Sequence, residues 1–197
     1  LQTLILKGTY DDSGKKLKIT TTRKAPNKLR YEFELDGIKT IIAHNGEIGW
    51  QRREKGDLLS IRDYVAGDFD WLKLNANFQT YLLRALAGEP GITLSLLEDV
   101  EVDGRVLHVI LVSTDSKFKM KYFLNSVSFY LERLDVLSPD GILLEGTVYS
   151  DYRKIEGISL AHQKQTTKAT GEILTYNWDT IEVNPTVYSF VFEKPKF

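Results

Sequence analysis

The stretch Thr40–Gln51 reads TIIAHNGEIGWQ, and its pattern decides the fold class. Apolar runs flank the pair Asn45-Gly46, whose two residues tolerate the positive φ angles of a type I′ turn. The stretch therefore predicts a β-hairpin with a tight turn at this pair. The hairpin ends on Trp50 at the start of the charged run QRREKGD, so the large indole must find apolar neighbours elsewhere in the fold.

The residues just before this hairpin alternate in the way that a half-buried strand requires. In the sequence LRYEFEL, apolar side chains fall on every second position and charged ones on the positions between. The apolar positions are Leu29, Tyr31, Phe33 and Leu35. Asp36-Gly37 then predicts another tight turn. Comparable short segments, separated by Gly-containing turns, continue to Val183 and predict a meander of about eleven antiparallel strands.

The apolar period changes between Asp57 and Gly88, where an amphipathic helix is predicted. Large apolar side chains recur there at intervals of three or four residues, which places them on one helical face. These side chains are Trp71, Leu74, Phe78, Tyr81 or Leu82, and Ala85. Gly88 followed by Pro90 is expected to end the helix. A shorter helical turn is predicted at Leu58–Val65.

The composition is that of an ordinary globular protein. The chain of 197 residues is long enough for one sizeable core, and one domain over residues 1–197 is predicted. The shares of 42% hydrophobic and 27% charged residues exclude wholesale disorder. The net charge of −1 does not favour a nucleic-acid partner, which needs a basic face. The absence of cysteine excludes thiol sites, and no apolar run is long enough for an integral membrane span.

The sequence carries no recognisable catalytic or metal site. His44, His108 and His162 stand far apart, without the spacing of a histidine-containing metal motif. No Gly-x-Ser-x-Gly elbow, phosphate-binding loop or dinucleotide-binding glycine motif is present. Asp151 and Arg153 are expected to form a structural ion pair at a strand end. We therefore predict a protein that is not an enzyme and that uses no metal and no cofactor.

Five local patterns, in chain order, resemble the LolA/LolB-like superfamily of bacterial envelope proteins, and within it the outer-membrane lipoprotein-sorting type. The patterns are RKAPNKLRYEFELDG (Arg23–Gly37), IIAHNGEIGW (Ile41–Trp50), DVEVDGRVLHVILV (Asp99–Val112), YSDYRKIEGISL (Tyr149–Leu160) and IEVNPTVYSFVFEKP (Ile181–Pro195). The chain departs from the family at Ala161, where Pro is usual, and at Asn125-Ser126, where Asp-Pro is common. The family's N-terminal helix and any signal segment are missing before Leu1, so we expect a trimmed or mature form.

The resemblance implies a mainly β fold, a curved antiparallel sheet or incompletely closed β-barrel, with inserted short helices plugging its concave side. It also implies a non-enzymatic binding or carrier protein of the periplasm, or one that faces the periplasm on a lipid anchor. The expected partner is a lipid, an acyl chain or a lipoprotein in an apolar half-barrel cavity. The alternative is an envelope protein-interaction module whose core is filled by its own side chains and holds no ligand.

Aromatic and apolar side chains of the helical segment and the facing strands are the candidate lining of that cavity. The residues expected to contact ligand are Tyr31, Phe33, Trp50, Trp71, Leu74, Phe78, Tyr81, Leu82, Phe118, Met120 and Tyr122. Trp50 is expected between the hairpin and the helical plug, and Arg30 near the rim is expected to hold a head group. The same side chains could equally be ordinary core, because aromatic faces at regular spacing usually are.

Overall fold

The structure, a computed structural model, describes residues 1–12, 14–115 and 118–196. The strands of the first half are β1 (Thr3–Asp12), β2 (Lys15–Lys24), β3 (Lys28–Leu35), β4 (Ile38–His44), β5 (Gly49–Lys55) and β6 (Leu58–Asp63). Those of the second half are β7 (Ile92–Leu96), β8 (Val100–Val102), β9 (Arg105–Thr114), β10 (Lys119–Asn125), β11 (Leu131–Leu137), β12 (Leu143–Ile155), β13 (Ile158–Lys168) and β14 (Ile173–Val183). The helices are α1 (Ala66–Ala76), α2 (Tyr81–Leu86) and the short 3₁₀ helix η1 (Ser189–Phe192).

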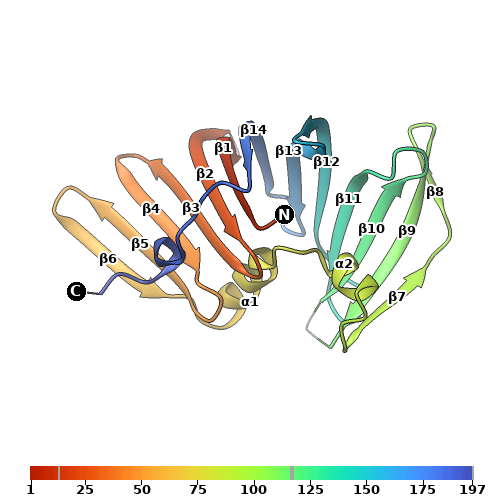
Figure 1. The fold of residues 1–197 in the computed structure, drawn as a ribbon, viewed down its shortest axis with the longest axis horizontal. Helices are drawn as coiled ribbons and strands as arrows, with labels where there is room; N and C mark the ends of the chain where they lie inside the picture. Colours follow the sequence, from red (N-terminus) through yellow and green to blue (C-terminus); the bar gives the residue numbers. More distant parts are fainter. Residues whose placement is uncertain (13, 116–117, 197) are drawn as a thin grey trace.

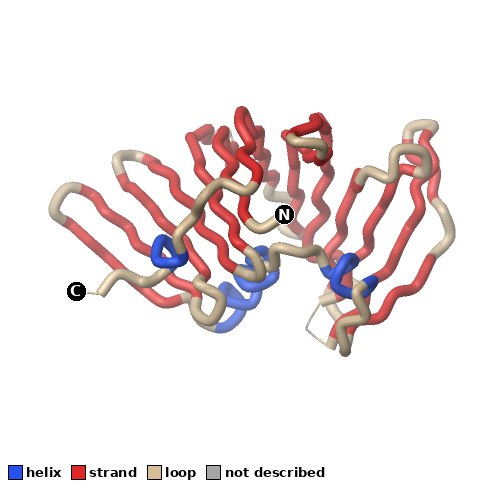
Figure 2. The backbone as a smooth tube through the Cα atoms, viewed as in Figure 1, coloured by secondary structure: helices blue, strands red, loops and turns tan. Residues whose placement is uncertain are grey.

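All strands belong to one 14-stranded antiparallel sheet, which curves around the two α-helices (Figure 1). The strand order is β6-β5-β4-β3-β2-β1-β14-β13-β12-β11-β10-β9-β7, and β8 pairs with β9. Figure 2 shows how short the helical segments are beside the strands. The predicted fold class, an open curved antiparallel sheet with inserted helices, is confirmed, with 14 strands in place of about eleven.

The helical region differs from its prediction in two respects. Leu58–Val65 is not a helical turn, because residues 58–63 form β6, which pairs with β5. The predicted long helix is divided into α1 and α2 by residues 77–80. The backbone N–H of Phe78 donates to Pro26 O (2.9 Å), outside any helix. The apolar spacing counted across this break therefore does not describe one helical face.

Two-residue turns form where Asp-Gly pairs predict them. Asp36 and Gly37 have φ angles of 53° and 73° and join Leu35 to Ile38, which pair across β3 and β4. Asp103 and Gly104 have φ angles of 51° and 72° and join β8 to β9 in the same way. Positive φ at both central residues is the signature of the type I′ turn, whose twist matches that of the strands.

The hairpin of β4 and β5 forms, but its turn is longer than predicted. His44 pairs with Gly49, so residues 45–48 make the loop in place of a two-residue turn at Asn45-Gly46. The Asn45 side chain organises this loop, because its Oδ1 accepts hydrogen bonds from the backbone N–H groups of Glu47 (3.0 Å) and Ile48 (2.9 Å). Such an Asx turn competes with the type I′ geometry.

Replacing Asn45 by alanine is expected to lower the free energy of unfolding by about 0.5–1.5 kcal/mol, because two loop hydrogen bonds lose their acceptor. Chemical denaturation of the purified protein measures this change. Glu47→Ala, at an exposed position of the same loop, is the control and is expected to change stability by less than about 0.5 kcal/mol. Equal losses in the two variants would show that the Asn45 amide does not organise the loop.

The two faces of the sheet carry different coverings. We call the face against which α1 and α2 pack the inner face; on β3 it carries Leu29 and Tyr31, which pack with Leu72 and Ala76 of α1. The opposite, outer face carries Arg30 on β3, because successive strand residues point to opposite sides. The register follows this alternation across β2 to β5.

Residues 184–196, the C-terminal strap, run across the outer face of β1 to β5 (Figure 1). Four backbone carbonyls of the strap accept hydrogen bonds from the side chains of four different strands. The pairs are Thr3 Oγ1 to Pro185 O (2.7 Å), Lys24 Nζ to Val187 O (2.7 Å), Arg30 Nη1 to Val191 O (2.7 Å) and Trp50 Nε1 to Phe192 O (2.8 Å). The Phe192 side chain is fully buried, so the strap is part of the core structure.

Packing on opposite faces of the sheet explains the two residues of the Gly49-Trp50 step. On the inner face, a Cβ on Gly49 would lie 2.7 Å from Leu72 Cδ2, so the close approach of α1 to β5 requires glycine. On the outer face, the Trp50 side chain is 1% exposed and is covered by the strap. The prediction that Trp50 lies between the hairpin and the helices is therefore wrong. The alternation of β5 places it on the opposite side, and a distant segment buries it.

The inner face holds three clusters of buried apolar side chains. The first contains Leu4, Ile19, Trp178, Ile181 and Val183, the second Val112, Met120, Tyr122 and Val136, and the third Leu29, Leu72 and Ala76. The first and second clusters lie in different halves of the curved sheet, both on its inner face. The helical region contributes Phe78 to the first cluster and Leu74, Tyr81 and Leu82 to the second. The helical segment therefore bridges the two halves of the inner face.

Candidate functional site

The helices cover the inner face unevenly, and the middle of this face is the candidate site. α1 packs against β3, β4 and β5, whereas α2 packs against β7 and β9. On the strands between these flanks, large side chains such as Tyr10 (β1), Leu160 (β13) and Tyr176 (β14) are only half-buried. The middle of the inner face is therefore an apolar and aromatic surface that solvent still reaches.

The structure brings nine of the eleven predicted lining residues together on this side of the sheet. From the sheet they are Tyr31, Phe33, Phe118, Met120 and Tyr122, and from the helical region Leu74, Phe78, Tyr81 and Leu82. They pack in the first and second apolar clusters. That these side chains contact a ligand stays a prediction.

Met120 and Tyr122 form the most deeply buried part of this set, and each is 2% exposed. Tyr81 and Leu82 at the start of α2 pack against them, and the Tyr122 hydroxyl donates to Met120 Sδ at 3.9 Å. Burial raises the pKa of Tyr122 to about 12. A ligand can reach these two side chains only after α2 moves away. In this conformation they form the surface against which α2 packs.

Trp71 is not packed into the apolar clusters, so its predicted place on the buried helical face is wrong; that it contacts a ligand stays a prediction. Its side chain is 38% exposed, whereas Leu72 and Ala76 of the same helix are fully buried against the sheet. The prediction aligned Trp71 with Phe78 and Tyr81 as members of one helix. Because α1 ends at Ala76, those later residues follow a different axis and do not report which face of α1 is buried.

Arg30 does not lie at the rim of the inner face, so its predicted position is also wrong. Its guanidinium is on the outer face, where Nε and Nη2 donate to the Glu32 carboxylate at 2.8 and 3.0 Å. Its Nη1 donates to Val191 O of the strap. The Arg30 side chain therefore fixes the strap to β3.

The three histidines lie at separate sites. His44 is fully buried, with Nδ1 2.9 Å from Asn27 O, and its pKa is lowered chiefly by burial. His162 is buried with Nδ1 2.8 Å from Trp178 O, and His108 Nδ1 lies 3.0 Å from an Asp99 carboxylate oxygen. Within residues 1–12, 14–115 and 118–196, no group of three or more His, Asp or Glu side chains is placed to hold a metal ion. Arg153 donates to both carboxylate oxygens of Asp151, which confirms that predicted ion pair.

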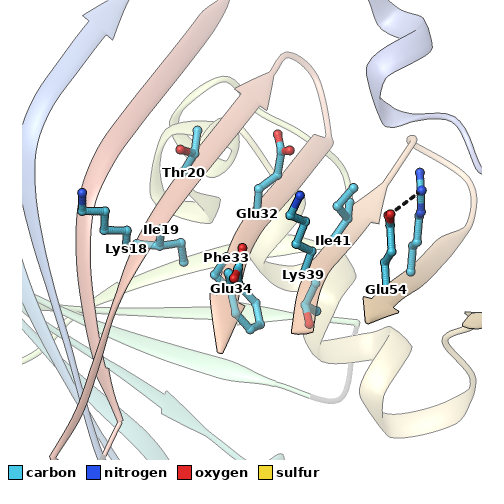
Figure 3. A pocket seen from close by; sticks show the side chains of 11 residues that line it. Lys18, Ile19, Thr20, Glu32, Phe33, Glu34, Lys39, Ile41 and Glu54 are labelled. Atoms are coloured by element: carbon cyan, nitrogen blue, oxygen red, sulfur yellow. Dashed lines mark hydrogen bonds and ion pairs between the residues drawn. The ribbon is translucent and has the colours of Figure 1, made fainter. Parts of the chain in front are cut away.

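A groove of about 320 Å³ runs over the outer face of β2 to β5 (Figure 3). Its lining carries the cations Lys18, Lys39 and Arg52 and the carboxylates Glu32, Glu34 and Glu54. Arg52 Nη2 donates to Glu54 Oε2 at 2.7 Å. Equal numbers of positive and negative side chains give this groove no preference for a ligand of either charge.

A second outer groove, of about 580 Å³, lies beside the strap. Ile5, Ile41 and Trp50 contribute from the sheet, and Tyr188 and Phe190 from the strap. The rings of Tyr188 and Phe190 stack with centroids 5.8 Å apart, although the two residues are 64% and 70% exposed. An exposed aromatic pair beside a groove is a feature of interaction surfaces.

Sequence reasoning missed two cationic side chains of the inner face, Arg23 on β2 and Lys164 on β13. Both lie among aromatic rings, Arg23 over Phe78 and Lys164 over Tyr176. Strand alternation could have revealed them, because residues an even number of positions apart point to the same face of a strand. Arg23 is four residues from Ile19, and Lys164 is four residues from Leu160. A cation in register with core residues is unlike the charged positions of a solvated strand face.

In the parts of the chain that the structure describes, no helix is both long enough and apolar enough to cross a membrane.

Comparison of the sequence with known protein families and with curated proteins finds no match. Solved structures share the fold at low sequence identity, among them the following three. A domain assigned to outer membrane lipoprotein sorting from Vibrio parahaemolyticus is 11% identical, with a TM-score of 0.69 over 97% of this chain and 89% of that one. A LolA superfamily protein from Nitrosomonas europaea (13% identity, TM-score 0.68) and a DUF1329 family protein from Desulfovibrio piger (13% identity, TM-score 0.66) each match over 98% of this chain and 90% of theirs.

Proposed function

Since the chain has a LolA-like fold, we propose that it is a non-enzymatic periplasmic carrier or receptor for a lipid, an acyl chain or a lipoprotein. The ligand lies along the middle of the inner face, between α1 and α2. One observation carries this proposal: the aromatic and apolar side chains there are only half-buried, because α1 packs mainly against β3, β4 and β5, and α2 mainly against β7 and β9. No covalent step is required.

The affinity of such a site comes from apolar burial. Each methylene transferred from water to an apolar surface contributes roughly 0.8 kcal/mol. A long acyl chain that lies across Phe33, Leu160 and Tyr176 would gain several such increments, which is enough to offset the loss of its freedom on binding. Displacement of α2, which packs against Tyr122, would enlarge the site and would also provide a route for release.

The solved structures support the proposal through their printed assignments, which include outer membrane lipoprotein sorting and the LolA superfamily. At 11–13% identity the likeness concerns the fold. The function proposed for this chain therefore depends on its own inner face.

Extraction of the purified protein followed by lipid mass spectrometry tests the proposal directly, and a bound lipid or acyl chain is expected. In parallel, the uncharged fluorescent probe N-phenyl-1-naphthylamine is expected to bind and to be displaced by long-chain lipids. If no lipid is recovered and the probe does not bind, the carrier function is wrong.

Two variants locate the binding surface. Phe33→Ala removes a half-buried ring from the inner face, and the probe affinity is expected to fall roughly tenfold. Phe190→Ala removes an exposed ring beside the outer groove and is the matched control, for which no change is expected. The reverse pattern would assign apolar binding to the outer groove and would contradict the proposal.

A second candidate function is an envelope protein-interaction module. The exposed Tyr188–Phe190 pair beside the outer groove favours it. The two functions differ in the surface they use, so the same pair of variants separates them.

A further inference from the structure

Lys164 occupies the middle of the inner face, between two tyrosines of the neighbouring strands. The register pairs it with Tyr149 on β12 and with Tyr176 on β14. Its Nζ lies 4.3 Å from the centroid of the Tyr176 ring, and the side chain is half-buried. Among the described residues, the ammonium of Lys164 has this ring contact and no ion pair.

Arg23 brings a second cation to the same region from β2. Its Nη2 donates to Asn75 O (3.2 Å) and to Asn77 O (2.6 Å), at the end of α1 and just after it. Its Nε is buried and has no hydrogen-bond partner within the described part of the chain. Thr21 is the preceding residue of β2 on the inner face and is 4% exposed. Its Oγ1 is also buried without a hydrogen-bond partner in the described part of the chain. Two buried polar groups of β2 therefore have unused hydrogen-bonding capacity.

Arg23 and Lys164 face the same part of the inner face, because Arg23 lies over Phe78, Lys164 lies over Tyr176, and both rings pack against the first apolar cluster. Burial is the main cause that lowers the pKa of each, and for Lys164 the charge of Arg23 lowers it further. Glu145 of β12 acts in the opposite direction on Lys164. The charged groups that act on Lys164 are thus one cation and one carboxylate. Together with Lys164 itself they leave an excess of one positive charge.

Two phenol groups complete the region. Burial raises the pKa of Tyr31 and of Tyr149, so both hydroxyls keep their protons at neutral pH and can donate hydrogen bonds. Tyr31 packs against the first apolar cluster, and Tyr149 lies on β12, beside β11, which contributes Val136 to the second. The polar groups therefore lie between two apolar surfaces, which is the arrangement that a ligand with an acidic head and an apolar chain requires.

We propose that Arg23 and Lys164, with the hydroxyls of Tyr31 and Tyr149, bind the acidic head group of an amphiphile. The head group is a carboxylate or a phosphate, and its acyl chain lies on the neighbouring apolar inner face. This inference rests on the proposed function and deepens it, because it specifies the charge of the ligand. It also replaces Arg30 with two inner-face cations as the head-group contact. Charge-assisted hydrogen bonds from Arg and Lys are the strong ones for such anions.

Three ligands separate the head group from the chain: oleate carries both, oleyl alcohol carries the chain alone, and acetate carries the head group alone. Binding of each to the full chain is measured by isothermal titration calorimetry. The wild type is expected to bind oleate at least about tenfold more tightly than oleyl alcohol, and acetate only weakly. Lys164→Met is expected to weaken oleate binding roughly tenfold and to leave oleyl alcohol binding unchanged.

Lys18→Met is the matched control, because Lys18 lies on the charged outer groove; no change is expected for any ligand. Tyr149→Phe is a second variant that removes one hydroxyl and keeps the ring, and it is expected to weaken oleate binding severalfold. Circular dichroism shows that each variant is folded.

The outcomes distinguish this inference from the proposed function. If the wild type binds neither oleate nor oleyl alcohol, the carrier function fails, and this inference fails with it. If it binds both equally and Lys164→Met and Tyr149→Phe change neither, the acidic head-group site is wrong and the carrier function stands. If acetate binds as tightly as oleate, the site recognises a small anion, and the amphiphile is wrong.

Discussion

Replacing Trp50 by alanine is expected to lower the free energy of unfolding by about 3–5 kcal/mol. The indole is 1% exposed between β5 and the C-terminal strap, and its Nε1 donates to Phe192 O at 2.8 Å. The substitution opens a cavity under the strap and leaves that buried carbonyl without its donor. Equilibrium denaturation in urea, monitored by far-ultraviolet circular dichroism, measures the loss.

Trp71→Ala is the matched control, because it removes the same side chain from a position that is 38% exposed on α1. A loss of less than about 1 kcal/mol is expected there. The difference between the two variants tests the assignment of the two tryptophans to a buried and an exposed position. Equal losses, or a larger loss for Trp71→Ala, would contradict it.

Replacing Lys164 by methionine is expected to raise the free energy of unfolding at pH 7 by about 1–3 kcal/mol. The pKa of Lys164 is lowered from 10.5 to about 8, chiefly by burial, so the folded state keeps this charge at a cost that the unfolded state does not have. Methionine has a similar shape and carries no charge. A residue that lowers stability in this way is typical of a site kept for function.

The stabilisation by Lys164→Met is expected to depend on pH with a definite sign. Below pH 8, both folded and unfolded wild type carry the charge, and the full cost of burial applies. Between about 8 and 10.5 the folded state loses the proton first, so the unfolded state binds more protons and wild-type stability rises with pH. The advantage of the variant therefore shrinks over this range.

Denaturation of the wild type and of Lys164→Met from pH 7 to 10.5 measures this effect, because the other titrating groups cancel in the difference. Lys18→Met, which changes an exposed residue of the outer face, is expected to show no such trend. A stability difference that is constant with pH would show that burial does not penalise the Lys164 charge.

Much of the sheet could be predicted from the sequence, because strand alternation and turn chemistry are local. The LRYEFEL pattern gave the inner face of β3 correctly, and the Asp-Gly pairs gave the two-residue turns. The turn at Asn45-Gly46 was wrong because the Asn45 side chain forms a longer Asx loop. The inserted helices could be placed only roughly. Leu58–Asp63 is a strand because it pairs with β5, and a local pattern does not show such pairing.

The candidate site could be predicted only in part, because alternation separates the two faces without showing what covers each one. Trp50 was expected against the helices and Arg30 near the rim of the cavity. Residues 184–196 instead cover both on the outer face, and this packing joins distant parts of the sequence. Arg23 and Lys164 come from strands far apart in the chain, yet lie over two rings that pack against the same apolar cluster. No local pattern reports such a placement.

The pairing of β1 with β14 has a consequence for how this protein acquires its structure. Apart from this pair and the β7–β9 pair, neighbours in the sheet order are also neighbours along the chain. The strands β1 to β6 and the strands β7 to β14 can therefore each form from local hairpins. The β1–β14 seam joins Leu4 to Val183, and it can form only when both ends of this long span are available. Loop closure over so long a span is slow, which makes this seam the expected kinetic bottleneck and leaves two unjoined half-sheets as the species most exposed to aggregation.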